Sequence, residues 1–233
     1  MKMGVQIESV TKPSTKRDKH MNLLYKTGFC LFWTITKCLY RMKVYGPAKR
    51  YPQGALLASN HASFFDPPFV GTAWKEEIHF LARDTLFNQP LLKQLLPHLN
   101  AHPIKRETID PGAIKMMTRL IKNGEKVLIF PEGSRTYDGQ LLPIKSGIGF
   151  IARLAHCAII PVYLSGTHEV WGRQRKFPKP WGKVACVFGS PILWEEFAEL
   201  DKRQIDQAIA DRLTLALEQL RSWYENGAQG TPP

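Results

Sequence analysis

The sequence predicts a single α/β domain in which helices flank a central, mostly parallel sheet. Three observations lead to this fold class. Short apolar runs of strand length recur along the chain, segments with helical spacing separate them, and polar motifs follow several of the runs directly. Strands that alternate with helices form parallel sheets, and 233 residues with 44% apolar composition suffice for one such domain. We therefore expect one folded domain at residues 46–226, preceded by an N-terminal arm.

The N-terminal part of the chain is strongly basic. Residues 1–50 hold eleven Lys and Arg against two acidic residues, so they contribute +9 of the total net charge of +12. Residues 1–20 lack apolar periodicity and are predicted to form a flexible basic leader. Anionic lipid headgroups attract a cluster of this kind next to an apolar segment. A solvated leader without any partner is the alternative explanation.

The arm at residues 21–45 is apolar and aromatic, with scattered cations. Its longest charge-free run, 27–36, has ten residues, whereas about 20 are needed to cross a bilayer. No small-x-small cleavage site follows, and Lys37 and Arg41 interrupt the apolar character, which argues against a secretory signal. Two interpretations stay open: an amphipathic helix in the membrane interface, or a helix packed on the protein's own core. Different faces of one helix can satisfy both.

Apolar runs and alternation locate the extended segments of the domain. Two of them, 78–82 and 100–106, carry weaker signals than the others, which are short or continuous apolar runs. The expected strands, in chain order, are 42–46, 55–59, 78–82, 100–106, 127–130, 158–164 and 184–188.

Helices are indicated by apolar spacing and by start and stop residues. Pro67 and Pro68 fit only the first turn of a helix, Asp110 is an N-cap before Pro111, and Pro97 is expected to end its helix. The expected helices are 64–74, 90–96, 111–123, 146–156 and 194–223. A basic, Trp-containing loop is expected at 171–181, and a disordered tail at 227–233.

The chain contains four cysteines without the CxxC spacing of metal or redox motifs. Cys30 and Cys38 lie in the apolar arm, and Cys157 and Cys186 lie in or beside expected strands. We predict buried, inert thiols in a reducing cytoplasm.

A potential proton acceptor, His61, lies five positions before a carboxylate, Asp66, directly after the buried run 55–59. Histidine is the side chain whose unperturbed pKa suits proton abstraction near neutrality, and Asp66 could fix its tautomer. The activated hydroxyl would then belong to a substrate. Ser63 is an internal alternative, although no nucleophile elbow surrounds it. In the purely structural alternative, Ser63 or Asp66 caps a helix and His61 only packs.

Two cations follow other expected strands. Arg106 ends the segment 100–106, and Arg135 ends the segment Pro131-Glu132-Gly133-Ser134-Arg135, which follows the run 127–130. Because the strand ends converge on one rim of a parallel sheet, both guanidinium groups could bind a phosphate there. Glu132 could hold a substrate hydroxyl, and Gly133 would let a ligand approach the backbone. Taken singly, each Arg could instead be a surface ion-pair partner.

These segments resemble the motifs of the glycerolipid acyltransferases, and more closely those of the PlsC-like 1-acylglycerol-3-phosphate acyltransferases. Asn60-His61 with Asp66 resembles their NHxxxxD motif, and Pro103 to Arg106 is similar to the second motif, although Ala101-His102 precedes it where Gly is usual. Phe130 to Arg135 matches FPEG(S/T)R, and Ile159 to Val162 resembles the fourth motif. Lys145-x-Gly147 also fits.

The resemblance implies transfer of a fatty acyl group from acyl-CoA or an acyl-carrier protein to the sn-2 hydroxyl of lysophosphatidic acid in phospholipid biosynthesis. His61 would be the general base and Asp66 its orienting partner, without a metal, a cofactor or a covalent intermediate. The acceptor would be bound by Asn60, Ser63, Arg106, Glu132, Gly133, Ser134 and Arg135. Because the acceptor is a lipid, the enzyme is expected to be peripheral or monotopic on the cytoplasmic face of the membrane.

Three rival functions stay open at this point. The first is a related acyltransferase with another lysolipid or hydroxyl acceptor. The second is a non-catalytic membrane-binding protein on the same scaffold, which would have no need of the His61 and Asp66 pair. The third is nucleic-acid binding, which we do not expect because the basic excess surrounds an apolar segment and does not form a basic face on the folded body. The oligomeric state is not predicted.

Overall fold

The computed structural model describes residues 23–46, 51–74, 76–104 and 110–233, with the side chains of Lys202 and Arg203 left out. The predicted leader at residues 1–20 lies outside this part of the chain, as does the predicted phosphate ligand Arg106.

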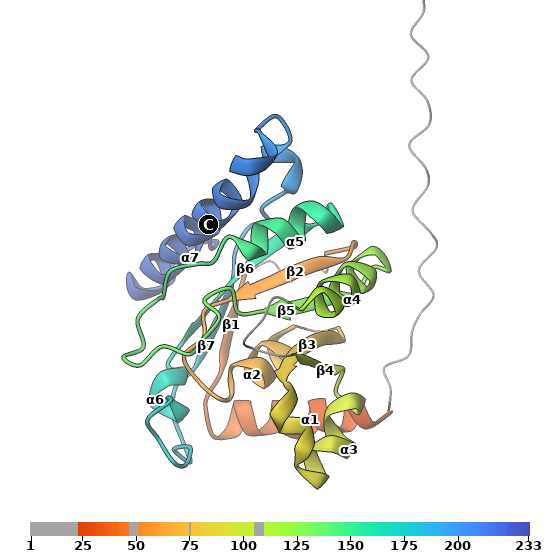
Figure 1. Ribbon diagram of the computed structural model, residues 1–233. Coiled ribbons are helices and arrows are strands. Elements are labelled where there is room, and N and C mark those ends of the chain that lie inside the picture. Colours follow the sequence, from red (N-terminus) through yellow and green to blue (C-terminus); the bar gives the residue numbers. More distant parts are fainter. Residues whose placement is uncertain (1–22, 47–50, 75, 105–109) are drawn as a thin grey trace, which may run out of the picture.

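The described residues form a seven-stranded sheet in the order β1-β7-β6-β2-β5-β3-β4 (Figure 1). Neighbouring strands are parallel except for the antiparallel pair β6 and β7. This confirms the predicted α/β fold with a mostly parallel sheet, and each strand lies close to its expected position. The strands are β1 (Lys43–Tyr45), β2 (Ala55–Ser59), β3 (Ile78–Arg83), β4 (Ala101–Ile104), β5 (Lys126–Ile129), β6 (Ala158–Ser165) and β7 (Ala185–Phe188).

Helices cover both faces of the sheet because successive strand residues point to opposite sides. Leu56 and Ala58 of β2 pack in a core with α4, α5 and α7, whereas Ala55 and Leu57 pack in a second core with α2 and with Phe32 and Ile35 of α1 (Figure 1). The α-helices are α1 (Leu23–Cys38), α2 (Asp66–Ala73), α3 (Pro90–His98), α4 (Pro111–Lys122), α5 (Gly147–Ala155), α6 (Thr167–Trp171) and α7 (Lys202–Glu225). Two short 3₁₀ helices are η1 (Asp84–Asn88) and η2 (Trp194–Phe197).

Helix α1 packs one of its faces on the body of the protein. The ring of Phe32 lies edge-on against Phe65 and Phe69, with ring centroids 5.6 and 5.9 Å apart. The buried hydroxyl of Tyr25 accepts a hydrogen bond from the amide of Ile78 at the start of β3 (3.2 Å). The inner face of the arm is therefore part of the core, as one of the two interpretations requires. None of the described helices is long and apolar enough to cross a membrane.

Apart from shifts of one or two residues at helix ends, three features of the helices differ from the sequence-based expectation. Pro97 lies inside α3, and the helix continues to His98 because the amides of Leu99 and Asn100 close its last turn on the carbonyls of Leu96 and Pro97 (3.1 and 3.2 Å). The expected helix 194–223 is divided into η2 and α7, since the carbonyl of Asp201 accepts from two amides at the start of α7. Helix α6, a single short turn after β6, was not expected.

The cysteines divide into two groups. Cys157 and Cys186 are buried as expected, and burial raises the pKa of Cys157 to about 12 and that of Cys186 well above its usual range. The same expectation is wrong for Cys30 and Cys38, which are exposed because they lie on the side of α1 that faces away from the core.

The end of the chain, where we expected disorder, lies against the body. The carbonyl of Pro233 accepts from the amide of Ser190 (3.0 Å), and the indole of Trp223 donates to the carbonyl of Gln229 (2.8 Å).

Candidate active site

The predicted site residues follow two neighbouring strands in the middle of the sheet. β2 and β5 are parallel and paired from Ala55 with Lys126 to Ala58 with Ile129, so both end at the same edge. The segments after them, from Asn60 and from Phe130, therefore leave the sheet side by side. The amide of Thr136 donates to the carbonyl of His61 (2.9 Å) and ties the two segments together.

His61 and Asp66 form a direct hydrogen bond. Nδ1 of His61 lies 2.8 Å from Oδ2 of Asp66, and the imidazole stacks on the ring of Phe130 with a centroid distance of 3.9 Å. Because a carboxylate only accepts, Nδ1 must carry the hydrogen, and Nε2 is left with its lone pair. The carboxylate is fully buried, whereas 16% of the His61 side chain is exposed. Asp66 thus holds His61 in one orientation, and Nε2 of this partly exposed side chain is available as a proton acceptor.

Asp66 also organises the loop that carries His61. Its Oδ2 accepts from the amides of Ala62 and Ser63 (2.7 Å each), and the residue is the first of α2, where a negative charge is favoured. Both amides precede α2, and no described side chain caps the start of this helix, so Asp66 orders the loop and does not act as the helix cap of the structural alternative. Its hydrogen bonds to the two amides hold the carboxylate in place, and its hydrogen bond to Nδ1 fixes the ring orientation of His61.

Two further motif residues make backbone contacts. The side chain of Asn60 is buried and joins β2 to β6: its Nδ2 donates to the carbonyl of Leu164 (3.0 Å), and its Oδ1 accepts from the amide of the same residue (2.7 Å). Ser63 is also buried, and its hydroxyl donates to the carbonyl of Trp171 (3.1 Å) and accepts from the amide of Phe65 (3.1 Å). These contacts assign structural roles to Asn60 and Ser63.

Glu132 is a buried carboxyl beside the His61 and Asp66 pair. Burial raises its pKa to about 8; the nearby charge of Asp66 acts in the same direction, and the backbone of Leu142 and His61 partly offsets it. Within the described residues neither carboxyl oxygen makes a well-formed hydrogen bond. At neutral pH the group is therefore mostly protonated and can donate as well as accept.

Cations lie at the same rim. The guanidinium carbon of Arg135 lies 3.4 Å from the ring centroid of Phe64. Gly133 has φ +76°, and a β-carbon there would come within 2.7 Å of Nζ of Lys145. Glycine is thus favoured by the backbone conformation, and a β-carbon would displace the end of the Lys145 side chain. Lys145 was not among the predicted site residues, although its spacing to Gly147 had marked it.

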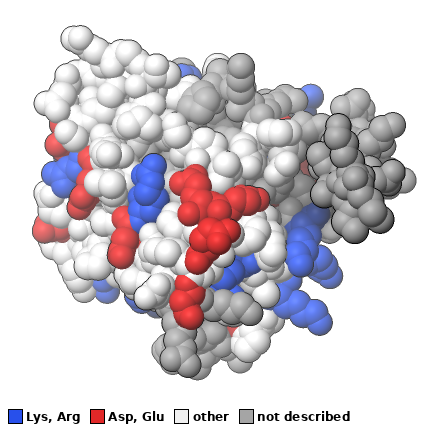
Figure 2. All heavy atoms as spheres, turned by 90° about the horizontal axis from the view of Figure 1, so that it is seen from above, with Lys and Arg blue, Asp and Glu red and all other residues white. Residues whose placement is uncertain are grey.

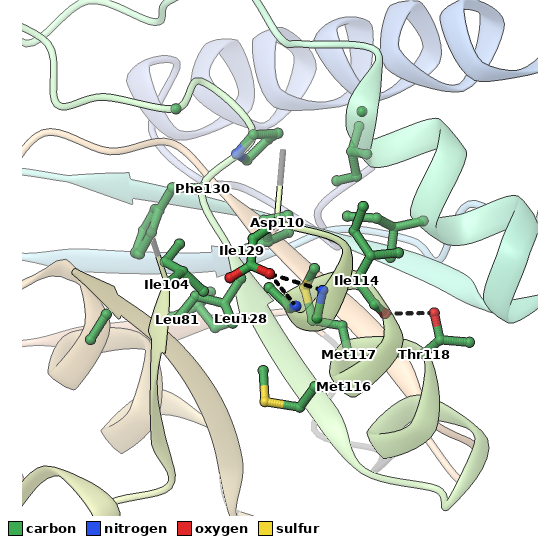
Figure 3. Close-up of a pocket in the computed structure, with 18 of the residues that line it drawn as sticks. Leu81, Ile104, Asp110, Ile114, Met116, Met117, Thr118, Leu128, Ile129 and Phe130 are labelled. Carbon is green, nitrogen blue, oxygen red and sulfur yellow. Dashed lines mark hydrogen bonds between the residues drawn. The ribbon is translucent and has the colours of Figure 1, made fainter. Parts of the chain in front are cut away.

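A large cavity opens beside these groups. It has a volume of about 1870 Å³, and His61, Arg135 and Lys145 lie in its wall. Away from them its wall is mainly apolar, with Leu81, Ile104 and Leu128 from the strands and Ile114 and Met116 from α4 (Figure 3). The arrangement offers a base and cations in the wall of a chamber that suits an apolar chain.

The predicted residues are thus only partly brought together at the cavity. His61, Gly133 and Arg135 line it, and Ile104, the last described residue before Arg106, lines it too. Ser134 is half-buried in the same turn. Among the described residues no three His, Cys, Asp or Glu side chains are grouped as metal ligands would be. The expectation of a reaction without metal or cofactor stays a prediction.

The sequence profile of a family described as acyltransferase matches residues 41–165 of the chain, which is more than half of it. The chain belongs to the acyltransferase family. The predicted family and enzyme class are thereby confirmed. The matched region of this acyltransferase begins just before β1 and ends with β6, so it includes both site segments and the Leu164 partner of Asn60.

Individual relatives agree with this assignment. The 1-acyl-sn-glycerol-3-phosphate acyltransferase of Bacillus subtilis is 29% identical over 170 residues, which cover 72% of this acyltransferase and 82% of the relative. The enzyme of the same name from Limnanthes douglasii is 37% identical over 135 residues, which cover 54% of this chain and 47% of the relative. The match thus spans about half the length of the plant relative.

A solved structure has the same fold. The crystal structure of the 1-acyl-sn-glycerophosphate (LPA) acyltransferase, PlsC, from Thermotoga maritima superposes with a TM-score of 0.66 at 22% identity. The superposition covers 85% of this chain and 78% of that one. At this level of identity the likeness concerns the fold.

Proposed function

We propose that the protein transfers a fatty acyl group from an acyl thioester to the sn-2 hydroxyl of lysophosphatidic acid and so forms phosphatidic acid. The observation that carries the proposal is the 2.8 Å contact between His61 and Asp66 in the wall of a large, mainly apolar cavity. The names of the Bacillus and Limnanthes relatives support this acceptor.

The chemistry needs no covalent enzyme intermediate. Nε2 of His61 takes the proton of the acceptor hydroxyl while its oxygen attacks the thioester carbonyl, and Asp66 balances the charge of the imidazolium. When the tetrahedral intermediate collapses, the C–S bond breaks and the imidazolium returns the proton to the leaving thiolate. General base catalysis of this kind contributes ~10²–10⁴-fold to the rate.

The cavity suggests how the substrates are arranged. Its volume of about 1870 Å³ exceeds the roughly 300–1,000 Å³ of typical small-ligand pockets, so it has room for an acyl chain and a headgroup. Arg135 and Lys145 lie on the same wall as His61 and would bind the phosphate, together with Arg106. Glu132 is buried behind the turn and does not line the cavity, so its protonated carboxyl would support the turn that carries Gly133 and Arg135. Acyl-CoA and acyl-carrier protein both remain possible donors.

The outward side of α1 supports a peripheral or monotopic position on the membrane. Leu23 and Leu31 are 77% and 64% exposed there. The hydroxyls of Thr27 and Thr34 on the same side donate to carbonyls four residues earlier (2.8 and 2.9 Å), so they need no partner from water. Such a face tolerates contact with lipid. We place the enzyme on the cytoplasmic leaflet, where its thioester donors are found.

Activity of the purified protein on a panel of lysolipids, with both thioester donors, tests the proposal. Lysophosphatidic acid should be the preferred acceptor, and His61→Ala should abolish transfer while circular dichroism and the unfolding midpoint stay unchanged. An equally active His61→Ala protein would refute the mechanism. Preference for an uncharged or differently substituted lysolipid would replace the acceptor and leave the mechanism standing.

A further inference from the structure

The loop at residues 172–183, between α6 and β7, carries an unusual combination of side chains. It contains five cations and no acidic residue, and all five cations are exposed: Arg173, Arg175, Lys176, Lys179 and Lys183. Between them, the rings of Phe177 and Trp181 are 71% and 72% exposed. We call residues 172–183 the basic loop. None of these side chains belongs to the core or the cavity wall.

The backbone of the basic loop is held firmly against the end of α1. The hydroxyl of Tyr40 donates to the carbonyl of Lys179 (2.9 Å), and the amide of Gly182 donates to the carbonyl of Leu39 (3.1 Å). The amide of Lys179 donates to the carbonyl of Val170 (2.8 Å). The exposed rings are therefore carried by a fixed backbone, which lies near the C-terminal end of α1 (Figure 1).

The start of the basic loop is joined to the catalytic loop. The carbonyl of Trp171 accepts from the amide of Phe64 (3.2 Å) and from the hydroxyl of Ser63 (3.1 Å), two residues that lie between His61 and Asp66. The rings of Trp171 and Phe64 are 4.7 Å apart, and the other side of Phe64 lies against the guanidinium of Arg135. A large partner that binds the basic loop therefore also sets the orientation of the active site relative to that partner.

A group of acidic side chains lies on the side of the molecule away from α1. In Figure 2, which looks down on the side away from α1, acidic side chains gather in the middle of the surface. The segment 194–201, between β7 and α7, holds four exposed acidic residues: Glu195, Glu196, Glu199 and Asp201. An anionic surface would repel this side and attract the basic loop.

We propose that the basic loop is a second membrane contact, which places Phe177 and Trp181 at headgroup depth in an anionic bilayer and, together with α1, turns the active site toward the lipid surface. Exposed aromatic rings among Lys and Arg are typical of interfacial anchors. An acidic carrier protein would require the cations but not the two exposed rings, so lipid explains more of the loop. The proposal rests on the proposed function only in that the acceptor lies in a membrane.

Two variants of the full-length protein test the contact. Phe177→Ser with Trp181→Ser removes the rings, and Arg175→Gln with Lys176→Gln and Lys183→Gln removes three charges. Leu215→Ser on α7, 49% exposed and distant from α1, is the matched control.

Sedimentation with vesicles of phosphatidylcholine, with and without phosphatidylglycerol, measures binding. The charge variant should bind anionic vesicles about 100-fold more weakly, from roughly fivefold per cation near the surface. The ring variant should bind both kinds of vesicle more weakly, and Leu215→Ser should bind like the unsubstituted protein.

Activity separates this contact from the proposed function. Both variants should lose activity on lysophosphatidic acid embedded in vesicles but keep it on a short-chain, monomeric lysophosphatidic acid. Vesicle binding equal to that of the unsubstituted protein would overturn the inference. So would normal vesicle binding with a loss confined to the acyl-carrier protein donor, which would make the loop a carrier-docking surface. If the unsubstituted protein acylates no lysolipid but the variants still lose vesicle binding, the contact stands and the proposed function fails.

Discussion

The buried carboxyl of Glu132 should make the folded protein less stable as pH rises. Its pKa is raised from 4.5 to about 8, so the folded state holds this proton more tightly than the unfolded chain does. The stability that comes from the protonated form is complete below pH 4.5 and is lost progressively as pH rises toward 8. Between pH 5 and pH 8 the loss is about 3 kcal/mol for this one group.

Glu132→Gln tests the size of this effect. The amide keeps the shape of the protonated carboxyl but does not titrate, so the variant should lack this part of the pH dependence. Urea unfolding of both proteins at the two pH values gives the comparison, because all other titrating groups cancel in the difference. In thermal unfolding, about 3 kcal/mol corresponds to roughly 6–12 °C for a domain of this size.

The control is Glu218→Gln, which replaces an exposed carboxyl on α7. It should leave the pH dependence unchanged. If the unsubstituted protein and Glu132→Gln lose stability in parallel from pH 5 to pH 8, Glu132 is already ionised at neutrality, and its role as a hydrogen-bond donor is refuted.

Three further substitutions have defined outcomes. Asp66→Asn keeps an acceptor for the loop amides but removes the charge that would balance the imidazolium. Steady-state kinetics should show kcat lower by ~10²–10⁴-fold with little change in KM. A change in KM alone would exclude the orienting role. Gly133→Ala should lower the unfolding free energy by ~1–3 kcal/mol because of the positive φ. Unaltered stability and activity would show that the turn adapts. Phe69→Ala removes a fully buried ring between α1 and the sheet and should cost ~3–5 kcal/mol in denaturant unfolding; a loss below about 1 kcal/mol would mean that the arm does not pack there in solution.

The sheet was predictable because several of its strands are short apolar runs in the sequence. β2 is buried at all five positions and β7 at all four, so each appears as a continuous apolar run. The antiparallel pairing of β7 with β6 could not be predicted from the apolar runs, because it depends on the path of the chain through α6 and the basic loop. Burial of Cys30 and Cys38 was mispredicted for a related reason: an apolar helix sequence does not reveal which side meets the core when both sides are apolar.

The site was predictable as a set of residues but not as a set of contacts. His61 and Asp66 are five residues apart, so their contact depends on one loop. Lys145 is different, because it reaches Gly133 from twelve positions later in the chain and only the folded turn brings the two together. The protonation of Glu132 likewise follows from burial among segments that are separate in the sequence.

The fixed spacing of His61 and Asp66 follows from two tasks performed by one oxygen atom. β2 ends at Ser59 and α2 begins at Asp66, so a short, partly buried loop must turn between them. Oδ2 of Asp66 accepts the loop amides of Ala62 and Ser63 as well as the Nδ1 hydrogen of His61. A shift of one residue would leave two buried amides without an acceptor, which folded proteins avoid. The loop therefore cannot close without also orienting the imidazole of His61, so the base that we propose would be held in place before any substrate binds.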